Sequence, residues 1–222
     1  IGGQAAGVPG TVSGFWKAHQ RFGKLPWKEL VEPAIKLAEE GFFPAKILVD
    51  DIHEMRDWFK DKTNFEQYFL HIDTKEKFKQ PELAETLRRI AEFGTEDFYF
   101  GKTAELIVEQ MKKSNGLITM EDLNAYEAVW RKPLRARWRD YEIISSPPPS
   151  SGGFAIIQLL KMKDYLQHYF INLDHNSAQY IHLVAEMEKR VFADRAEYLG
   201  DPDFFDIDME TLISEDYIAK RA

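Results

Sequence analysis

The chain has 222 residues, 44% of them hydrophobic and 14% aromatic, so it can bury a sizeable core as one large domain or two small ones. Its 37 acidic and 29 basic side chains give a net charge of -8, which argues against a general nucleic-acid or anionic-membrane partner, because phosphate binding depends on clustered Lys and Arg. The absence of cysteine excludes disulfides, thiol catalysis and cysteine-ligated zinc. No apolar run approaches the ~20 residues that span a bilayer.

The N-terminal half of the chain carries mainly helical signals. A first helix is predicted from Thr11 to Gly23. A second is predicted to open at Pro26 and to end at Gly41, with Pro33 expected to kink or restart it.

Further helices are expected wherever apolar residues recur with helical spacing. The polar, Lys-rich and aperiodic stretch 61–80 is instead predicted to be a mobile or variable connection within the domain. The further predicted helices are 45–59, 81–93, 102–113 and a short helix capped by Thr119 and Asp122.

Strand signals concentrate in two runs, 134–138 and 141–145, which flank a two-residue turn at Arg139-Asp140 and predict an antiparallel hairpin. The hairpin is locally basic, which could indicate an anion or nucleic-acid patch. We favour a solvated strand face that is ion-paired to the acidic surplus, because stacking aromatic residues are not interleaved as a single-strand platform requires. The basic residues are Arg131, Lys132, Arg135, Arg137 and Arg139.

Residues 145–153, Ser-Ser-Pro-Pro-Pro-Ser-Ser-Gly-Gly, mark an abrupt change of backbone. Three prolines fix an extended segment without N–H donors, and the residues after them can turn the chain and open an amphipathic helix. Ser150 and Ser151 could be nucleophiles, but the sequence shows neither the Gly-x-Ser-x-Gly motif nor a base positioned to activate them. Capping of the following helix is the favoured interpretation.

The other chemical motifs fail when their spacing is checked. Three glycines near the N-terminus suggest a phosphate cradle, yet the Gly-Lys-Ser/Thr end of a P-loop is missing and the dinucleotide spacing is wrong, so tight turns and close packing are favoured. These glycines are Gly7, Gly10 and Gly14.

The spacing of the histidines does not match a known metal-binding motif. His53-Glu54 begins like a zinc-protease motif, but Asp57 stands where the second histidine would fall. His168 and His175 are seven residues apart with no third ligand at a recognisable interval, so surface or capping roles are favoured.

One long helix is predicted from the N-cap Ser177 to Gly200. Steps of 100° per residue place Glu188 and Arg195 at the centre of its apolar face, so we expect each charge to be buried against a fixed partner from another element. The apolar face comprises Ile181, Val184, Ala185, Val191, Phe192 and Leu199.

Five stretches, in order, resemble the large subunit of γ-glutamyltranspeptidases. Short runs that contain Gly and Pro recur by chance, but five ordered matches with compatible spacing are specific, and the resemblance spans nearly the whole chain. The matching stretches are 7–15, 33–42, 116–123, 145–160 and 188–202.

The resemblance implies an N-terminal-nucleophile hydrolase without a cofactor. In that family a precursor cleaves itself, and the new N-terminal threonine of the small subunit attacks the γ-glutamyl amide of glutathione and similar compounds. The acyl-enzyme is then released to water or to an amino acid. The complete enzyme is a four-layer αββα sandwich, to which residues 1–222 would contribute helices and the hairpin as a single, predominantly helical α+β domain.

The resemblance places the catalytic machinery outside this chain. The family's nucleophilic threonine lies downstream of the stretch like Lys220-Arg221-Ala222, and the arginine that binds the substrate α-carboxylate lies upstream of Ile1. The oxyanion-hole Gly-Gly and substrate-binding Ser-Ser also belong to the small subunit, so residues 150–153 are not these groups. We therefore expect no catalytic, substrate-binding or metal-binding residue in 1–222, and no activity of the chain alone.

The expected partners are the small catalytic subunit of the same precursor and a γ-glutamyl substrate, with no nucleic acid. The Ile1-Gly2-Gly3 start resembles an internal one, so any targeting segment would precede it, and the resemblance favours a periplasmic or extracellular location. In this reading a buried Glu188–Arg195 network could orient the chain against the small subunit or be purely structural. The alternatives are a non-catalytic helical scaffold or binding module, a cephalosporin acylase, and a poly-γ-glutamate-processing enzyme.

Overall fold

A computed structural model describes residues 2–222, and Ile1 lies outside the described residues. Contacts within the chain divide it into two compact units, unit 1 up to Val129 and unit 2 from Trp130 to Ala222. The sequence analysis predicts a single domain. It remains a prediction that the two units act as one domain in a complete enzyme. Each unit has a hydrophobic core of its own.

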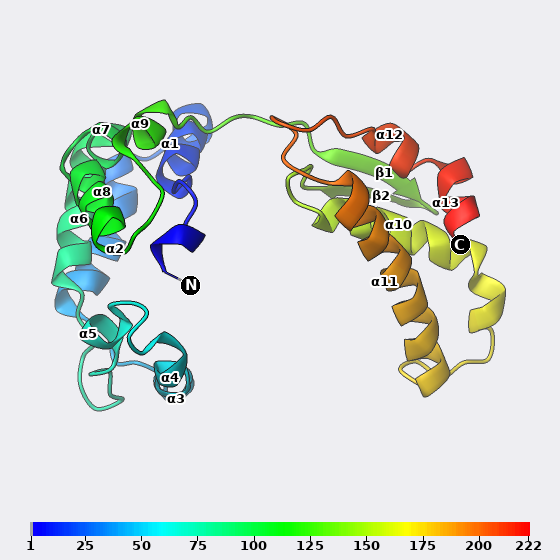
Figure 1. Cartoon of the computed structure of the whole chain (residues 1–222), viewed down its shortest axis with the longest axis horizontal. Helices are drawn as coiled ribbons and strands as arrows, with labels where there is room; N and C mark the ends of the chain where they lie inside the picture. The colour runs from blue at the N-terminus through cyan, green and yellow to red at the C-terminus, as the bar shows by residue number, and fades with distance from the viewer. Residues whose placement is uncertain (1) are drawn as a thin grey trace. The chain divides into compact units, whose positions relative to one another are not determined.

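Unit 1 is helical throughout its regular structure. Helices α2 and α6 lie side by side (Figure 1), and the Trp27 indole N–H of α2 donates to the Ile90 carbonyl of α6 at 2.9 Å. Its elements are η1 (Gly3–Ala5), α1 (Thr11–Phe22), α2 (Trp27–Glu40), α3 (Lys46–Glu54), α4 (Arg56–Phe59), α5 (Phe65–Phe69), α6 (Pro81–Phe93), α7 (Thr95–Phe100), α8 (Lys102–Lys113) and α9 (Met120–Ala125).

Most of the predicted helices of unit 1 are confirmed. α2 continues through Pro33 as one helix, whereas the predicted helix 45–59 is divided at Met55. The capping box that Thr119 and Asp122 predict is present, with the Thr119 side chain accepting the Asp122 N–H at 3.2 Å. The short α7 was not predicted, because six residues carry too little periodicity.

Residues 61–80 are more than a connection, and this part of the prediction is wrong. They include α5, and two apolar side chains from this stretch, Ile72 and Phe78, are buried with Val49 of α3 in a small core of their own. Phe42 and Phe78 also pair their backbones in an isolated antiparallel bridge. Phe65, Tyr68, Phe69 and Ile72 do follow the i, i+3, i+4, i+7 spacing of a helix, but this short signal was passed over because polar and Lys residues dominate the stretch.

Unit 2 joins a hairpin to a set of helices. The strands pair in the predicted register, from Leu134 opposite Ser145 to Trp138 opposite Tyr141, and Arg139 turns the chain with φ 54°. α10 packs against the hairpin, α11 and α13 (Figure 1), so the predominantly helical α+β class is confirmed. The elements are β1 (Leu134–Trp138), β2 (Tyr141–Ser145), α10 (Gly152–Tyr165), η2 (Gln167–Phe170), α11 (Ala178–Tyr198), α12 (Met209–Leu212) and α13 (Glu215–Arg221).

The long helix α11 begins at its predicted N-cap, where the Ser177 side chain accepts the Tyr180 N–H. Its buried face differs from the prediction, because Met187, Val191 and Asp194 face the core at spacings of four and three residues. Glu188 and Arg195 are exposed, so the expectation that both are buried charges is wrong.

This assignment of the core can be tested by mutation. Phe154→Ala on α10 removes a fully buried ring and should lower the free energy of unfolding by about 3–5 kcal/mol, measured by urea denaturation. The matched control is Phe192→Ala on α11, whose ring is 57% exposed and should cost about 1 kcal/mol or less. Equal losses from the two variants would contradict the assignment.

Candidate functional site

The segment that joins β2 to α10 carries the two serines that the sequence singles out. Ser151 is the N-cap residue of α10, but its side chain makes no capping bond. Its Oγ instead accepts a hydrogen bond from Nε of Arg195 at 2.9 Å, so the predicted capping role of Ser151 is corrected. Ser150 Oγ accepts the Gly152 N–H at 3.4 Å, a local bond that supports the start of the helix.

The Ser151–Arg195 bond also bears on reactivity. A serine nucleophile needs a neighbouring base that takes its proton. A guanidinium is permanently protonated and offers donors alone, so Arg195 cannot act as that base. The contact ties the start of α10 to α11, and its geometry is that of a structural link.

Gly153 lies against the strand-to-helix turn. A Cβ at this position would lie 2.7 Å from the Ser146 carbonyl oxygen and 2.9 Å from the Ser145 Cβ. A Cβ on the neighbouring Gly152 would meet nothing nearer than Ser150 Oγ at 3.7 Å. The second glycine of the pair is therefore required for close packing of α10 on β2.

A buried carboxylate connects three helices of unit 2. Asp194 of α11 is 3% exposed, and its Oδ1 is 2.8 Å from Nη2 of Arg221 at the end of α13. Gln158 of α10 donates its amide N–H to Asp194 Oδ2 at 3.2 Å and to the Leu212 carbonyl at 2.8 Å. Burial and the adjacent negative charge of Asp194, to which the Tyr217 hydroxyl donates, raise the pKa of Tyr217 to about 12.

This cluster replaces the buried network that the sequence placed on Glu188 and Arg195. The charged residue of α11 that faces the core is Asp194, one position before Arg195. The buried face therefore lies about 100° around the helix from the predicted one. The spacing of Met187, Val191 and Asp194 was present in the sequence. It was passed over because an aspartate does not count as a core residue in a hydrophobic pattern.

Three of the five basic residues at the hairpin are ion-paired, as predicted. Nη1 of Arg135 is 2.7 Å from Glu142 across the two strands, and Nη2 of Arg139 is 2.6 Å from Asp164 on α10. Arg131 pairs with Asp203 at 2.6 Å. These cations are bound to carboxylates of unit 2, which supports the solvated-face interpretation over a nucleic-acid patch.

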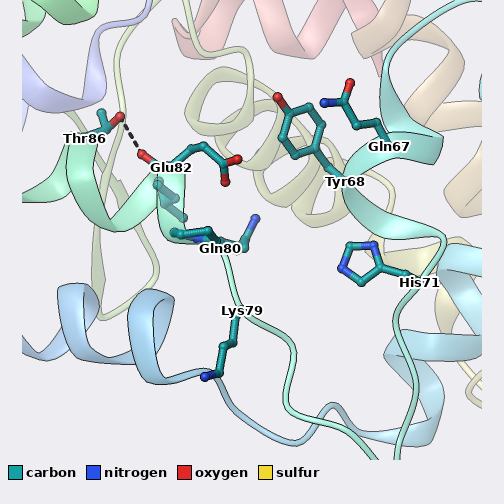
Figure 2. A pocket seen from close by; sticks show the side chains of 9 residues that line it. Gln67, Tyr68, His71, Lys79, Gln80, Glu82 and Thr86 are labelled. Carbon is teal, nitrogen blue, oxygen red and sulfur yellow. Dashed lines mark hydrogen bonds between the residues drawn. The ribbon is translucent and has the colours of Figure 1, made fainter.

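Unit 1 contains a pocket of about 490 Å³ between α5 and the start of α6, shown in Figure 2. Glu82 and Tyr68 lie on opposite sides of it, and Thr86 Oγ1 donates to the Glu82 carbonyl at 3.0 Å. Its mixed charges could hold a small polar molecule, but none of the residues that the sequence singles out lines it. The lining residues are Gln67, Tyr68, His71, Lys79, Gln80, Pro81, Glu82, Leu83 and Thr86.

The remaining sequence candidates do not converge on one site. A Cβ at Gly10 would collide with the Tyr126 hydroxyl, in keeping with a packing role for this glycine, whereas a Cβ at Gly7 or Gly14 would meet nothing within 4 Å, so close packing was the wrong prediction for these two. His53 lies in α3 of unit 1, whereas His168 and His175 lie in unit 2, where the His175 ring contacts Tyr180. Within residues 2–222, no group of three or more His, Asp or Glu side chains could hold a metal ion. No helix in the same range is both long and apolar enough to cross a bilayer.

The glycine pair gives a sharp test of the turn. Gly153→Ala should lower the stability of the chain by about 1–3 kcal/mol, because the new methyl group overlaps the Ser146 carbonyl. Gly152→Ala should be neutral or stabilising by up to about 1 kcal/mol, because alanine favours the helix and has room there. Thermal melting of both variants measures the difference, and a Gly153→Ala variant that melts like the parent would exclude the packing role.

The buried carboxylate gives a second test, which depends on pH. The unfolded chain releases the Tyr217 proton near pH 10.0 and the folded chain near 12, so this contribution to stability is fully present below about pH 10 and is lost as the pH rises through 12. Asp194→Asn should lower the Tyr217 pKa, measured by tyrosinate absorbance against a Tyr217→Phe reference.

Asp194→Asn should also destabilise the fold by about 1–3 kcal/mol, because Arg221 loses its partner. The control Glu186→Gln, which removes surface ion pairs with Lys189 and Arg190, should change stability by no more than about 1 kcal/mol. A Tyr217 titration that does not respond to Asp194→Asn would show that the carboxylate does not act on it.

The chain was compared with known proteins. The gamma-glutamyltranspeptidase family profile matches residues 1–222. The chain is 50% identical over its full length to a glutathione hydrolase proenzyme of Pseudomonas aeruginosa, of which it covers 40%, and 35% identical to an acylase ACY 1 proenzyme of Pseudomonas sp. strain V22, of which it also covers 40%.

A solved gamma-glutamyltranspeptidase from Pseudomonas nitroreducens, complexed with L-DON, superposes with a TM-score of 0.95 at 51% identity. The match covers 99% of this chain and 66% of that one. The chain therefore spans about 40% of the length of the curated relatives it matches. The residues that carried the resemblance thus led to the right family: the chain belongs to the gamma-glutamyltranspeptidases.

Proposed function

We propose that residues 1–222 form the large-subunit region of a γ-glutamyltranspeptidase-like enzyme, which cleaves γ-glutamyl amides such as glutathione and transfers the γ-glutamyl group to water or amino acids. The observation that carries the proposal is the match to this family over the whole chain, in sequence and in fold. The 50% identity to a glutathione hydrolase proenzyme favours glutathione as the substrate.

In this proposal the chain supplies the scaffold and a second subunit supplies the chemistry. Acyl transfer by an N-terminal threonine needs that residue's own α-amino group as base and donors that face the oxyanion. We place both in a small subunit cut from the same precursor, and the proenzyme names of the relatives support this division. Catalytic and substrate-binding residues are accordingly not assigned to any position of residues 1–222.

The exposed surface of the chain supports a large partner. The chain exposes 15215 Å², whereas two separate folded bodies with the sizes of the two units would together expose about 12,600 Å². The excess of about 2,600 Å² lies in the range of an obligate subunit interface.

An acylase of the same family is the second candidate. The 35% identity to an acylase ACY 1 proenzyme, over the full chain, favours it over unrelated enzymes. A non-catalytic helical scaffold is the candidate from a different class, and it predicts that the chain supports no turnover in any assembly.

A segment-replacement chimera tests the proposal. Residues 1–222 are substituted for the matching segment of the Pseudomonas aeruginosa proenzyme, to which they are 50% identical. The chimera should cleave itself into two subunits and release the chromophore from a γ-glutamyl anilide, whereas the isolated 222-residue chain should not. The controls are the parent proenzyme and a chimera in which the segment is in scrambled order.

The alternatives give different results in the same assay. Turnover of an acyl amide without turnover of the γ-glutamyl anilide would favour the acylase. A chimera that folds but turns over neither substrate would favour the scaffold, and activity of the isolated chain would contradict the division between two subunits.

A further inference from the structure

The pocket between α5 and the start of α6 has walls that the fold of unit 1 holds in place. The wall that carries His71 is anchored by the next residue, Ile72, which is 3% exposed and packs in a small core with Phe78. The other wall is anchored to α2, because the Gln80 backbone N–H donates to the Ala38 carbonyl at 2.8 Å. The volume of about 490 Å³ is within the ~300–1,000 Å³ that is typical of small-molecule sites.

The polar side chains of this pocket are not paired with one another. Within residues 2–222, the side chains of Glu82 on α6 and of Tyr68 and His71 at the facing wall form no hydrogen bond and no ion pair. By contrast, the nearby carboxylate of Glu66 on α5 is paired with Arg56 at 3.3 Å. Glu82 therefore presents a carboxylate to the pocket that no basic side chain neutralises, and this carboxylate is available to a ligand.

The two ends of the pocket differ in the charge that they favour. Figure 2 shows the Glu82 carboxylate directed from α6 toward the Tyr68 ring, and the His71 ring directed inward from the other side. A carboxylate next to an aromatic ring favours an ammonium group, by charge and by cation–π attraction. His71 and Lys79 can donate to an anion, and in this view the Lys79 ammonium is turned away from Glu82.

This arrangement favours a ligand with a positive end, an apolar middle and a negative end. In a single α-amino acid the two charged groups share one carbon atom, which is too short a separation for partners on opposite walls. Each further residue of a peptide adds about 3.5 Å between the charges. An apolar side chain of the peptide can lie over Leu83, which lines the pocket and is 42% exposed, and over Pro81.

We infer that this pocket is a binding site for short peptides with free amino and carboxyl ends. The ammonium group binds between Glu82 and the Tyr68 ring, and the carboxylate binds to His71 and Lys79. The inference goes beyond the proposed function and does not rest on it, because all of these residues belong to unit 1 and binding requires no second subunit.

Calorimetric titration of the 222-residue chain with the dipeptide glycyl-leucine tests the site. Three matched compounds each lack one feature: N-acetyl-glycyl-leucine lacks the ammonium group, glycyl-leucinamide lacks the carboxylate, and free leucine lacks the length. Each should bind at least about tenfold more weakly than the dipeptide. Equal affinity for the dipeptide and its blocked forms would overturn the inference, and so would the absence of any binding of the dipeptide at about 10 mM.

A pair of variants assigns the ammonium end to one carboxylate. Glu82→Gln should weaken binding of glycyl-leucine at least about tenfold, but it should not weaken binding of the N-acetyl form, which has no ammonium group. The matched control Glu85→Gln changes an exposed residue of the same helix that does not line the pocket, so it should bind like the parent. Both positions are exposed, and both variants should keep the urea midpoint of the parent. A Glu82→Gln variant that binds the dipeptide as the parent does would exclude the site.

Proton NMR locates the bound peptide by a second measurement. The ring resonances of His71, identified by their loss in His71→Gln, should shift when glycyl-leucine is added, whereas those of the exposed His53 on α3 should not. Equal shifts of the two rings, or none, would contradict binding in this pocket. Failure of these tests would leave the proposed function intact, and an inactive chimera would leave the peptide site intact.

Discussion

The interaction on which unit 2 depends is the buried carboxylate of Asp194. A carboxylate that leaves water loses its hydration, and this cost is offset only when charged and polar partners replace the water. Arg221 and Gln158 provide these partners from α13 and α10. Because the partners come from different helices, the three helices must meet in one arrangement, whereas apolar contacts alone would tolerate several.

Unit 1 also has a buried aspartate that bonds to neighbouring helices. Asp97 of α7 is 9% exposed. Its carboxylate accepts a hydrogen bond from Arg89 Nε of α6 at 3.1 Å and one from the Lys102 backbone N–H, at the start of α8, at 3.2 Å. The Thr103 hydroxyl also bonds to this carboxylate. In both units, therefore, a buried aspartate fixes the angle between consecutive or neighbouring helices, and the apolar core fills the space around it.

The sequence predicted the elements whose signals are local. The hairpin follows from alternation and a two-residue turn, and α6 and α8 follow from helical periodicity between clear boundaries. The exposure of Glu188 and the burial of Asp194 depend on which side of α11 meets α10, and the hydrophobic pattern did not decide between the sides because an aspartate does not count as a core residue in it. The burial of Phe78 depends on contacts with Phe42 and Val49 from distant positions in the chain.

The sequence located the Ser-Ser-Gly-Gly segment, but the contacts of its side chains could not be predicted from it. The Ser-Ser-Gly-Gly run has the residue types of a catalytic segment, but its serine contacts an arginine and its second glycine packs against a strand. What the run provides is a rigid entry into α10, and α10 in turn holds α11 through the Gln158–Asp194 bond. A catalytic constellation needs its supporting elements held within a fraction of an ångström. In the function proposed for this chain, its contribution to the reaction is therefore to hold α10 and α11 in one fixed arrangement.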